Sequence, residues 1–285
     1  MLRKSQLLFV FVLLSTLISA QKVGLVLSGG GARGITHIGV IKALEENNIP
    51  IDYITGTSMG AIVGSLYAMG YTSDDMIEVL KSDDFKRWST GDIDPKYSFY
   101  FRNSDHKPTI AELYFDLQHL DSLKFKPTFL PTNIVSPRQM NYAFVELFSR
   151  ANALAKGNFD NLLVPFRCVA SDIYNKEAVV LRDGDLGDAV RASMTFPFMF
   201  KPIKIKNQLL FDGGIFNNFP VDVMRNDFKP DVMIGSVVSN NPPKPGENDI
   251  IKQIENMIVN RSDYSMNDDE GILMKFNLEN VSTFD

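Results

Sequence analysis

The sequence contains the stretch Ile54-Thr55-Gly56-Thr57-Ser58-Met59-Gly60, which predicts a strand, a sharp turn and a helix in direct succession. Residues 51–54 form a short apolar run rich in β-branched side chains, and residues 61–69 carry apolar and small side chains at helical spacing. Between the two runs lies G-x-S-x-G, the pattern of a nucleophile elbow. The two glycines let strand and helix approach closely, and the serine is expected at the apex, beside the helix N-terminus. A glycine-eased turn in which Ser58 only caps the helix fits the same pattern.

The composition is that of an ordinary globular protein. The 285 residues are 45% hydrophobic and 22% charged, which suits a chain with a substantial core. The formal net charge is −5 and no block rich in Lys or Arg is present, so we expect no nucleic-acid partner. Cys168 is the single cysteine, which rules out an intrachain disulfide and a thiolate metal cluster. It lies in an apolar run, and we predict that it is a small core residue of a strand.

The N-terminus predicts export. Arg3 and Lys4 precede an apolar run from Leu7 to Ile18, and the small residues Ser19-Ala20 follow. This order of charged, apolar and small residues is typical of a signal peptide, and the run is short for a membrane span. A retained anchor helix is the alternative. We expect a signal peptide over residues 1–20, a catalytic domain over residues 21–285, and a location in the periplasm, at the outer membrane or outside the cell.

Strands and helices alternate over most of the chain, which predicts the α/β class with three layers around a largely parallel sheet. The predicted strands are residues 23–27, 51–54, 163–170, 178–181, 232–239 and 274–278, with a hairpin of residues 201–206 and 208–211. The predicted helices are residues 35–47, 61–69, 74–81 (capped by Ser73), 138–154, 185–192, 221–225 and 250–259. Residues 84–137 have a weak pattern, in which only residues 97–101 and 109–117 are candidate strands.

A glycine-rich loop, Gly29-Gly30-Gly31-Ala32-Arg33-Gly34, follows the first strand and opens the first helix. It matches G-x-G-x-x-G, the dinucleotide-binding fingerprint. Asp52 is the candidate for the ribose carboxylate, but it begins the second strand, whereas that carboxylate belongs at the strand's end. An exported protein also has little access to nicotinamide cofactors. The backbone N–H groups of the loop could instead form an oxyanion hole beside Ser58, because both loops leave the carboxyl ends of strands in one βαβ unit. Arg33 could add positive charge there or be solvated.

The sequence lacks the histidine that usually follows the acid in a hydrolase with this elbow. The only histidines are His37, His106 and His119, and for His37 a packing or capping role is expected. The remaining candidate base is Asp212, which ends an apolar strand and precedes Gly213-Gly214. A carboxylate can act as a general base if burial raises its pKa toward the working pH. A structural aspartate in a D-G turn is the simpler interpretation of this motif.

Together, the glycine loop, Gly56-Thr57-Ser58-Met59-Gly60 and Asp212-Gly213-Gly214 resemble the patatin-like phospholipase family. The segment Arg191-Ala192-Ser193-Met194-Thr195-Phe196-Pro197 looks like the family's stretch upstream of the Asp-Gly motif. The resemblance covers residues 24–80 and 165–238, and no motif position departs from the family pattern. Three motifs in the right order make it specific.

The resemblance implies a lipid acyl hydrolase, a phospholipase A or an esterase, with a patatin-like fold. It implies Ser58 as nucleophile, Asp212 as base, and the loop Gly29 to Gly34 as oxyanion hole. It implies no metal and no organic cofactor, and a lipid or phospholipid substrate met at a membrane surface. Acyl-chain contact or burial in the core is expected for Met194, Phe196, Phe198, Met199 and Phe200. The alternatives are a non-catalytic patatin-like passenger of a larger outer-membrane protein and, less favoured, a dinucleotide-binding protein.

Overall fold

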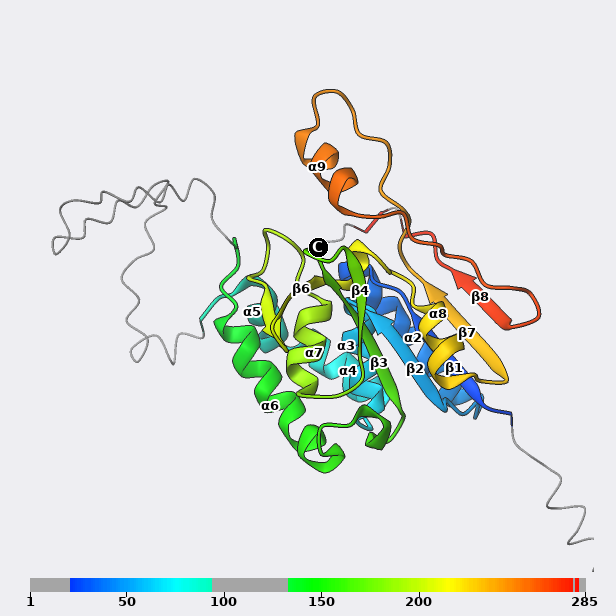
Figure 1. Ribbon diagram of the computed structural model, residues 1–285. Helices are drawn as coiled ribbons and strands as arrows, with labels where there is room; N and C mark the ends of the chain where they lie inside the picture. The colour runs from blue at the N-terminus through cyan, green and yellow to red at the C-terminus, as the bar shows by residue number, and fades with distance from the viewer. Residues whose placement is uncertain (1–20, 94–132, 279, 282–285) are drawn as a thin grey trace, which may run out of the picture.

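The computed structural model describes residues 21–93, 133–278 and 280–281, and Figure 1 shows their arrangement. The expected signal peptide, residues 1–20, lies outside the described residues. So do the two candidate strands at residues 97–101 and 109–117.

A single sheet of eight strands forms the centre of the described part, in the order β5-β6-β3-β2-β1-β7-β8, with β4 also paired to β3. The strands are β1 (Val23–Leu27), β2 (Tyr53–Thr57), β3 (Phe166–Asp172), β4 (Glu177–Leu181), β5 (Ile203–Ile205), β6 (Gln208–Asp212), β7 (Val232–Val237) and β8 (Gly271–Lys275). All pairs among β3, β2, β1, β7 and β8 are parallel. The pairs that involve β4, β5 and β6 are antiparallel. The predicted α/β class with a largely parallel sheet is confirmed.

The two faces of the sheet carry unequal layers (Figure 1). The main core lies on one face, where Leu25 and Leu27 point, and Val26 points to a smaller apolar cluster on the other. The helices of the main face are α2 (Thr36–Glu46), α3 (Met59–Ala68), α4 (Ser73–Lys81), α5 (Asp83–Thr90), α6 (Arg138–Ala155) and α7 (Leu186–Ser193). In the described part of the chain, the helical elements on the other face are the short α8 (Val221–Val223) and the π-helical turn η5 (Met224–Phe228). The three layers are therefore present, and one is thin.

One further helix, α9 (Ile250–Ile258), lies in the long connection between β7 and β8, away from both layers (Figure 1). It exposes the apolar side chains of Ile250 and Met257. No helix in the described ranges has the length and the apolar character that crossing a membrane requires.

Several predicted boundaries are wrong, for local reasons. β2 covers Tyr53–Thr57 and not residues 51–54, because the chain stays extended through Gly56 and Thr57, which pair with β3, up to the elbow. The cap of α4 is Thr72 and not Ser73, because Thr72 and Asp75 form a reciprocal capping box. The structure adds α5, which the weak pattern after residue 84 concealed, and it places β8 at 271–275, three residues before the predicted strand.

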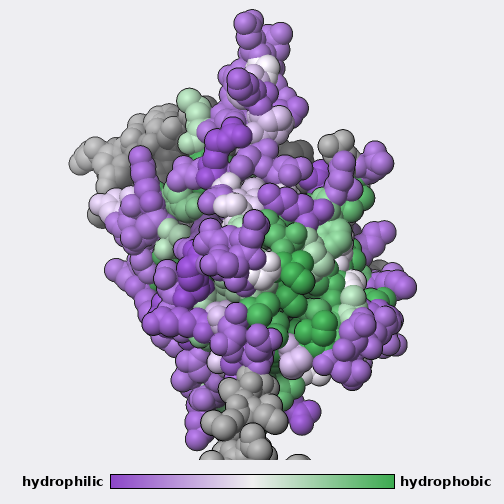
Figure 2. All heavy atoms as spheres, turned by 90° about the vertical axis from the view of Figure 1, so that its right-hand side faces the viewer, coloured by the Kyte–Doolittle hydropathy of each residue, from purple (hydrophilic) through white to green (hydrophobic). Residues whose placement is uncertain are grey.

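β8 forms one edge of the sheet, and apolar side chains gather on this side of the molecule (Figure 2). Ile272 of β8 is 63% exposed, while Ile234, its partner on β7, is buried. On the main apolar face, the side chains are therefore buried on β7 but exposed to solvent on the edge strand β8.

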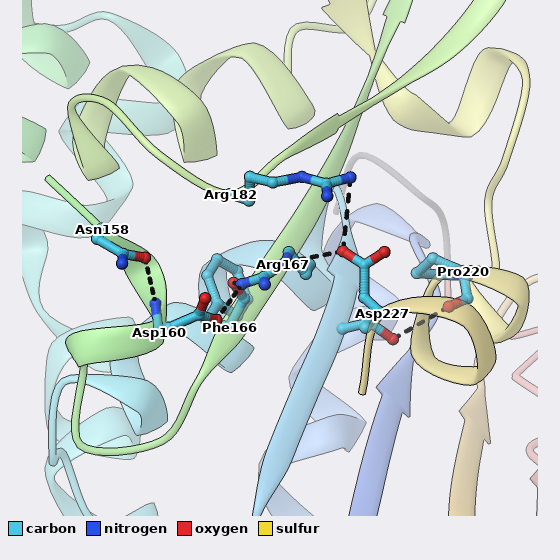
Figure 3. Close-up of polar contacts among 8 residues, drawn as sticks. Asn158, Asp160, Phe166, Arg167, Arg182, Pro220 and Asp227 are labelled. Carbon is cyan, nitrogen blue, oxygen red and sulfur yellow. Dashed lines mark hydrogen bonds and ion pairs between the residues drawn. The ribbon is translucent and has the colours of Figure 1, made fainter. Parts of the chain in front are cut away.

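A buried arginine on β3 joins the sheet to two turns (Figure 3). The side chain of Arg167 is 7% exposed and pairs with Asp160 at 2.7 Å and with Asp227 at 2.9 Å. Asp160 lies in the 3-10 turn η3 (Phe159–Asn161), and Asp227 lies in η5. The guanidinium also lies 4.6 Å from the ring centre of Phe228. Arg167 thus holds η5 against the face of the sheet that the thin layer covers.

Replacing Arg167 with alanine should lower the free energy of unfolding by about 3–5 kcal/mol, because it leaves the largely buried Asp227 carboxylate without its main partner. Arg182 is the matched control: it approaches the same carboxylate at 3.5 Å but is 52% exposed. Arg182→Ala should cost about 1 kcal/mol or less. Urea denaturation curves of both variants measure the difference, and equal losses would show that the burial of Arg167 is not what matters.

Candidate active site

Ser58 occupies the turn between β2 and α3 with φ 54° and ψ −120°. A residue with a side chain pays about 1–3 kcal/mol for such a backbone conformation. Close approach explains the flanking glycines: a Cβ on Gly56 would lie 2.4 Å from the carbonyl oxygen of Gly60. A Cβ on Gly60 would lie 2.5 Å from the carbonyl oxygen of Leu27. The turn therefore presents the Ser58 hydroxyl at the end of the strand, beside the N-terminus of α3.

The pairing of β3 brings Asp212 to Ser58. Cys168 and Val169 pair with both β2 and β4, so these two strands lie on opposite edges of β3. Residues 170–172 pair with both β4 and β6, so β6 shares an edge with β2. β2 ends opposite Val169 and β6 ends opposite Ala170. Ser58 follows β2 directly, and its Oγ donates a hydrogen bond to Oδ2 of Asp212 at 2.8 Å.

Asp212 is held by three hydrogen bonds, two to its carboxylate and one from its backbone. Its other oxygen, Oδ1, accepts a hydrogen bond from the Gly214 N–H at 2.8 Å, and its own N–H donates to the carbonyl of Thr195. Asp212 is 6% exposed. Burial raises the pKa of Asp212 to about 6, and the hydrogen bonds from Gly214 and Ser58 oppose the rise. The carboxylate is therefore ionised at neutral pH and is a stronger base than an exposed aspartate.

Gly213 and Gly214 form the first part of the 3-10 turn η4 (Gly213–Ile215) that follows Asp212. A Cβ on Gly213 would lie 2.1 Å from the carbonyl oxygen of Val169, so β3 leaves no room for a side chain. This close approach keeps the turn after Asp212 against β3, the strand with which β2 also pairs.

Ser193, at the end of α7, holds the backbone of the elbow. Its Oγ accepts a hydrogen bond from the Ser58 N–H at 3.0 Å and donates one to the carbonyl of Val169 at 2.6 Å. Ser193 is fully buried. The segment that contains Ser193 carries part of the family resemblance, but its partners cannot be deduced from the sequence because Ser58 and Val169 lie far from it along the chain.

The glycine loop packs against the elbow. A Cβ on Gly29 would lie 3.2 Å from Cβ of Ser58, and one on Gly34 would lie 2.2 Å from the side chain of Met59. The Gly29 N–H donates to the carbonyl of Asn218, so it is already engaged. In the described part of the chain, the N–H groups of Gly30 and Gly31 make no hydrogen bond to another backbone group. These two groups are therefore free donors of the loop, and Gly31 adopts φ 55° at the start of the 3-10 turn η1 (Gly31–Ile35).

Arg33 and His37 make contacts away from the Ser58 hydroxyl. The Arg33 Nε donates to the carbonyl of Val281 near the C-terminus. His37 is fully buried, and its Nε2 contacts the Ser28 carbonyl while its Nδ1 contacts the Ser236 hydroxyl, both at 2.8 Å. Burial lowers the pKa of His37 to about 4, so the ring is neutral. Since a carbonyl only accepts, Nε2 carries the proton and the Ser236 hydroxyl donates to Nδ1. His37 thus packs behind the glycine loop, and His106 and His119 lie outside the described residues.

The geometry does not suit a dinucleotide. Asp52 lies at the start of β2, where its carboxylate accepts from the Lys22 ammonium and the Val23 N–H. The glycine loop lies at the other, carboxyl end of these parallel strands. The described residues also contain no group of three or more His, Cys, Asp or Glu side chains that could hold a metal ion.

The apolar segment after Ser193 is mainly core. Phe200 is buried, and Met194 and Met199 pack against the main core. Phe198 is half exposed and Phe196 is partly exposed, and neither belongs to the main core. A cavity of about 520 Å³ lies beside α8 and is lined by Phe216, Asn217, Phe219, Arg225, Arg261 and Ser262, among others. Neither Ser58 nor Asp212 lines it, so this cavity is separate from the pair.

Comparison with known proteins identifies the family. The patatin-like phospholipase family model matches residues 25–225. The chain is 31% identical over 218 residues to a patatin-like phospholipase domain-containing protein of Caenorhabditis elegans, covering 76% of this chain and 14% of that protein. It is 28% identical over 240 residues to lysophospholipase NTE1 of Candida albicans, covering 83% of this chain and 15% of that protein. The chain thus spans only a small part of these relatives.

Among solved structures, VipD from Legionella pneumophila is similar with a TM-score of 0.47 and 18% identity, covering 82% of this chain and 53% of VipD. The family match extends over most of the described sheet and includes all three motifs. The chain therefore belongs to the patatin-like phospholipase family.

Proposed function

We propose that this protein is a serine acyl hydrolase that cleaves acyl esters of lipids, with Ser58 as nucleophile and Asp212 as general base. The observation that carries the proposal is the 2.8 Å hydrogen bond from the Ser58 hydroxyl to the buried Asp212 carboxylate. A serine hydroxyl is a weak nucleophile until a nearby base accepts its proton. A buried carboxylate with a raised pKa is suited to that role.

The proposed reaction uses these residues in the following order. Ser58 Oγ attacks the ester carbonyl while Asp212 Oδ2 takes its proton, and the carbonyl oxygen becomes an oxyanion. The free N–H groups of Gly30 and Gly31 are the candidate donors to this oxyanion. Collapse expels the alcohol, which takes the proton from Asp212. Water then loses a proton to Asp212 as it attacks the acyl-enzyme. The fatty acid leaves, and Asp212 returns the proton to Ser58 Oγ, so both residues regain their initial states.

The proposed substrates are phospholipids or lysophospholipids at a membrane surface. Membership in the patatin-like phospholipase family supports this class, as does the name of the NTE1 relatives, lysophospholipase. The apolar run near the N-terminus supports the further proposal that residues 1–20 direct export and that the mature catalytic domain begins at residue 21. The periplasm, the outer membrane or the exterior would then be the place of action.

Ser58→Ala should abolish hydrolysis of a p-nitrophenyl acyl ester, because it removes the hydroxyl that is proposed to form the acyl-enzyme. Asp212→Asn should lower kcat by about 10²–10⁴-fold, the usual contribution of a general base. Ser65→Ala is the matched control, since Ser65 lies on the same helix and its hydroxyl donates to the Ile62 carbonyl within that helix. Fluorophosphonate labelling read by mass spectrometry should locate the probe on Ser58 in wild type. Full turnover in Asp212→Asn would remove the proposed base, and an unlabelled, inactive wild type would favour the non-catalytic passenger.

The rate should depend on pH through Asp212. The base must be ionised, and its pKa is raised to about 6, so kcat/KM should fall about tenfold per pH unit below that value. Circular dichroism across the same range separates this loss from unfolding. A rate that stays level down to the ordinary pKa of an exposed aspartate would contradict the buried base.

The buried Asp212 carboxylate should lower the free energy of unfolding when it is ionised. Its pKa is higher in the folded chain than in the unfolded chain, so the folded state binds this proton more tightly. Stability attributable to Asp212 should therefore rise as pH falls from about 6 to about 4. Asp212→Asn should have a higher Tm than wild type at a pH well above 6, and the advantage should shrink on acidification. Calorimetry at several pH values tests this, and an advantage that grew on acidification would contradict it.

A further inference from the structure

Asn218 connects the two glycine-containing turns of the candidate site. It lies between η4 and α8, six residues after Asp212 in the sequence. Its carbonyl accepts the hydrogen bond from Gly29, and its N–H donates to Oγ of Ser262 at 3.1 Å. The backbone of Asn218 therefore joins the glycine loop to the turn after Asp212 and to the connection that precedes β8.

The side-chain amide of Asn218 enters the gap between these turns. The atom assigned as Oδ1 lies 2.2 Å from the position that a Cβ on Gly29 would take, and that position is 3.2 Å from Cβ of Ser58. The same atom lies 2.8 Å from the corresponding position on Gly214, which is 3.0 Å from Oδ1 of Asp212. One end of the amide is thus beside both members of the Ser58–Asp212 pair, and both glycines are needed to admit it.

The other end of the amide contacts the Tyr264 hydroxyl at 2.6 Å. This separation is typical of an O–H···O hydrogen bond and is shorter than the usual N–H···O range. The two ends of an asparagine amide have nearly the same shape, so hydrogen-bond partners decide which way it faces. With Oδ1 toward Tyr264, the phenol donates and the distance is normal. The NH2 group then faces Ser58. In the opposite orientation Oδ1 would face Ser58, and no donor among the described residues bonds to it there.

We propose that the Asn218 amide presents its NH2 group to the reacting centre as a further oxyanion donor, beside the N–H groups of Gly30 and Gly31, and that Tyr264 is the positioning residue that sets this orientation. The inference rests on the proposed acyl hydrolase function. Ser262 and Tyr264 lie beyond the matched residues 25–225, so a segment outside the family match completes the site.

The test compares Asn218→Ala and Asn218→Asp with Asn217→Ala. Asn218→Asp keeps the shape and an acceptor for Tyr264 but has no NH2 group. Asn217 is the matched control, because its amide donates to the exposed Asp222 at 2.7 Å. Both Asn218 variants should lose about 10²-fold in kcat, the usual cost of one oxyanion donor, with KM nearly unchanged. A trifluoromethyl ketone, whose adduct on serine carries an oxyanion, should lose affinity by a similar factor. Asn217→Ala should match wild type.

Tyr264→Phe gives a second test that keeps the ring against Phe219. It should lower kcat and ketone affinity by less than the Asn218 variants, with KM and Tm close to wild type. The inference is overturned if kcat of Asn218→Asp stays near wild type, or if ketone affinity is unchanged while KM and Tm deteriorate, which is the signature of a merely structural residue. If the wild type is active and the Asn218 variants keep its kcat, only this inference is overturned. A wild type without turnover would overturn the proposed function as well.

Discussion

One edge of β3 receives two strands that run in opposite directions. β2 pairs with its first half and β6 with its second half, and the ends of the two strands meet opposite the neighbouring residues Val169 and Ala170. Ser58 and Asp212 are separated by 154 positions in the chain, yet this pairing makes them neighbours. A shift of β6 by one residue would turn the Asp212 side chain to the other face of the sheet, and a shift by two would move it by about 7 Å. The proposed chemistry therefore depends on strand register.

The site concentrates features that oppose folding. Ser58 has an unfavourable backbone conformation, and Asp212 is a carboxylate in a buried position. Hydrogen bonds from the surrounding elements offset part of this cost: Ser193 holds the Ser58 N–H, and Gly214 donates to Asp212. The rest must come from the main core, where α3 and α7 pack on the sheet directly beneath these turns. Strain and burial at functional positions are commonly maintained in this way.

The sequence was sufficient for the features that depend on local pattern. The elbow, the turn after Asp212 and the hairpin of β5 and β6 each carry turn residues between apolar runs, and α6 shows helical periodicity over its full length. Contacts between distant segments could not be predicted. Ser193 is one serine among many until α7 is placed beside the elbow, and Asn218 has no local signal apart from the preceding glycines. The hydrogen bond from the Gly29 N–H to the Asn218 carbonyl likewise could not be predicted, and it removes Gly29 from the candidate oxyanion donors of the loop.

The most direct test of the central claim is a crystal structure of the protein after reaction with a fluorophosphonate. The phosphorus atom then stands in for the tetrahedral carbon, and its unsubstituted oxygen stands in for the oxyanion. Our account predicts a bond from phosphorus to Ser58 Oγ, with Asp212 still adjacent and the oxygen about 2.7–3.1 Å from the N–H groups of Gly30 or Gly31. Phosphorus on another residue, or an oxygen that points to solvent away from the glycine loop, would contradict it.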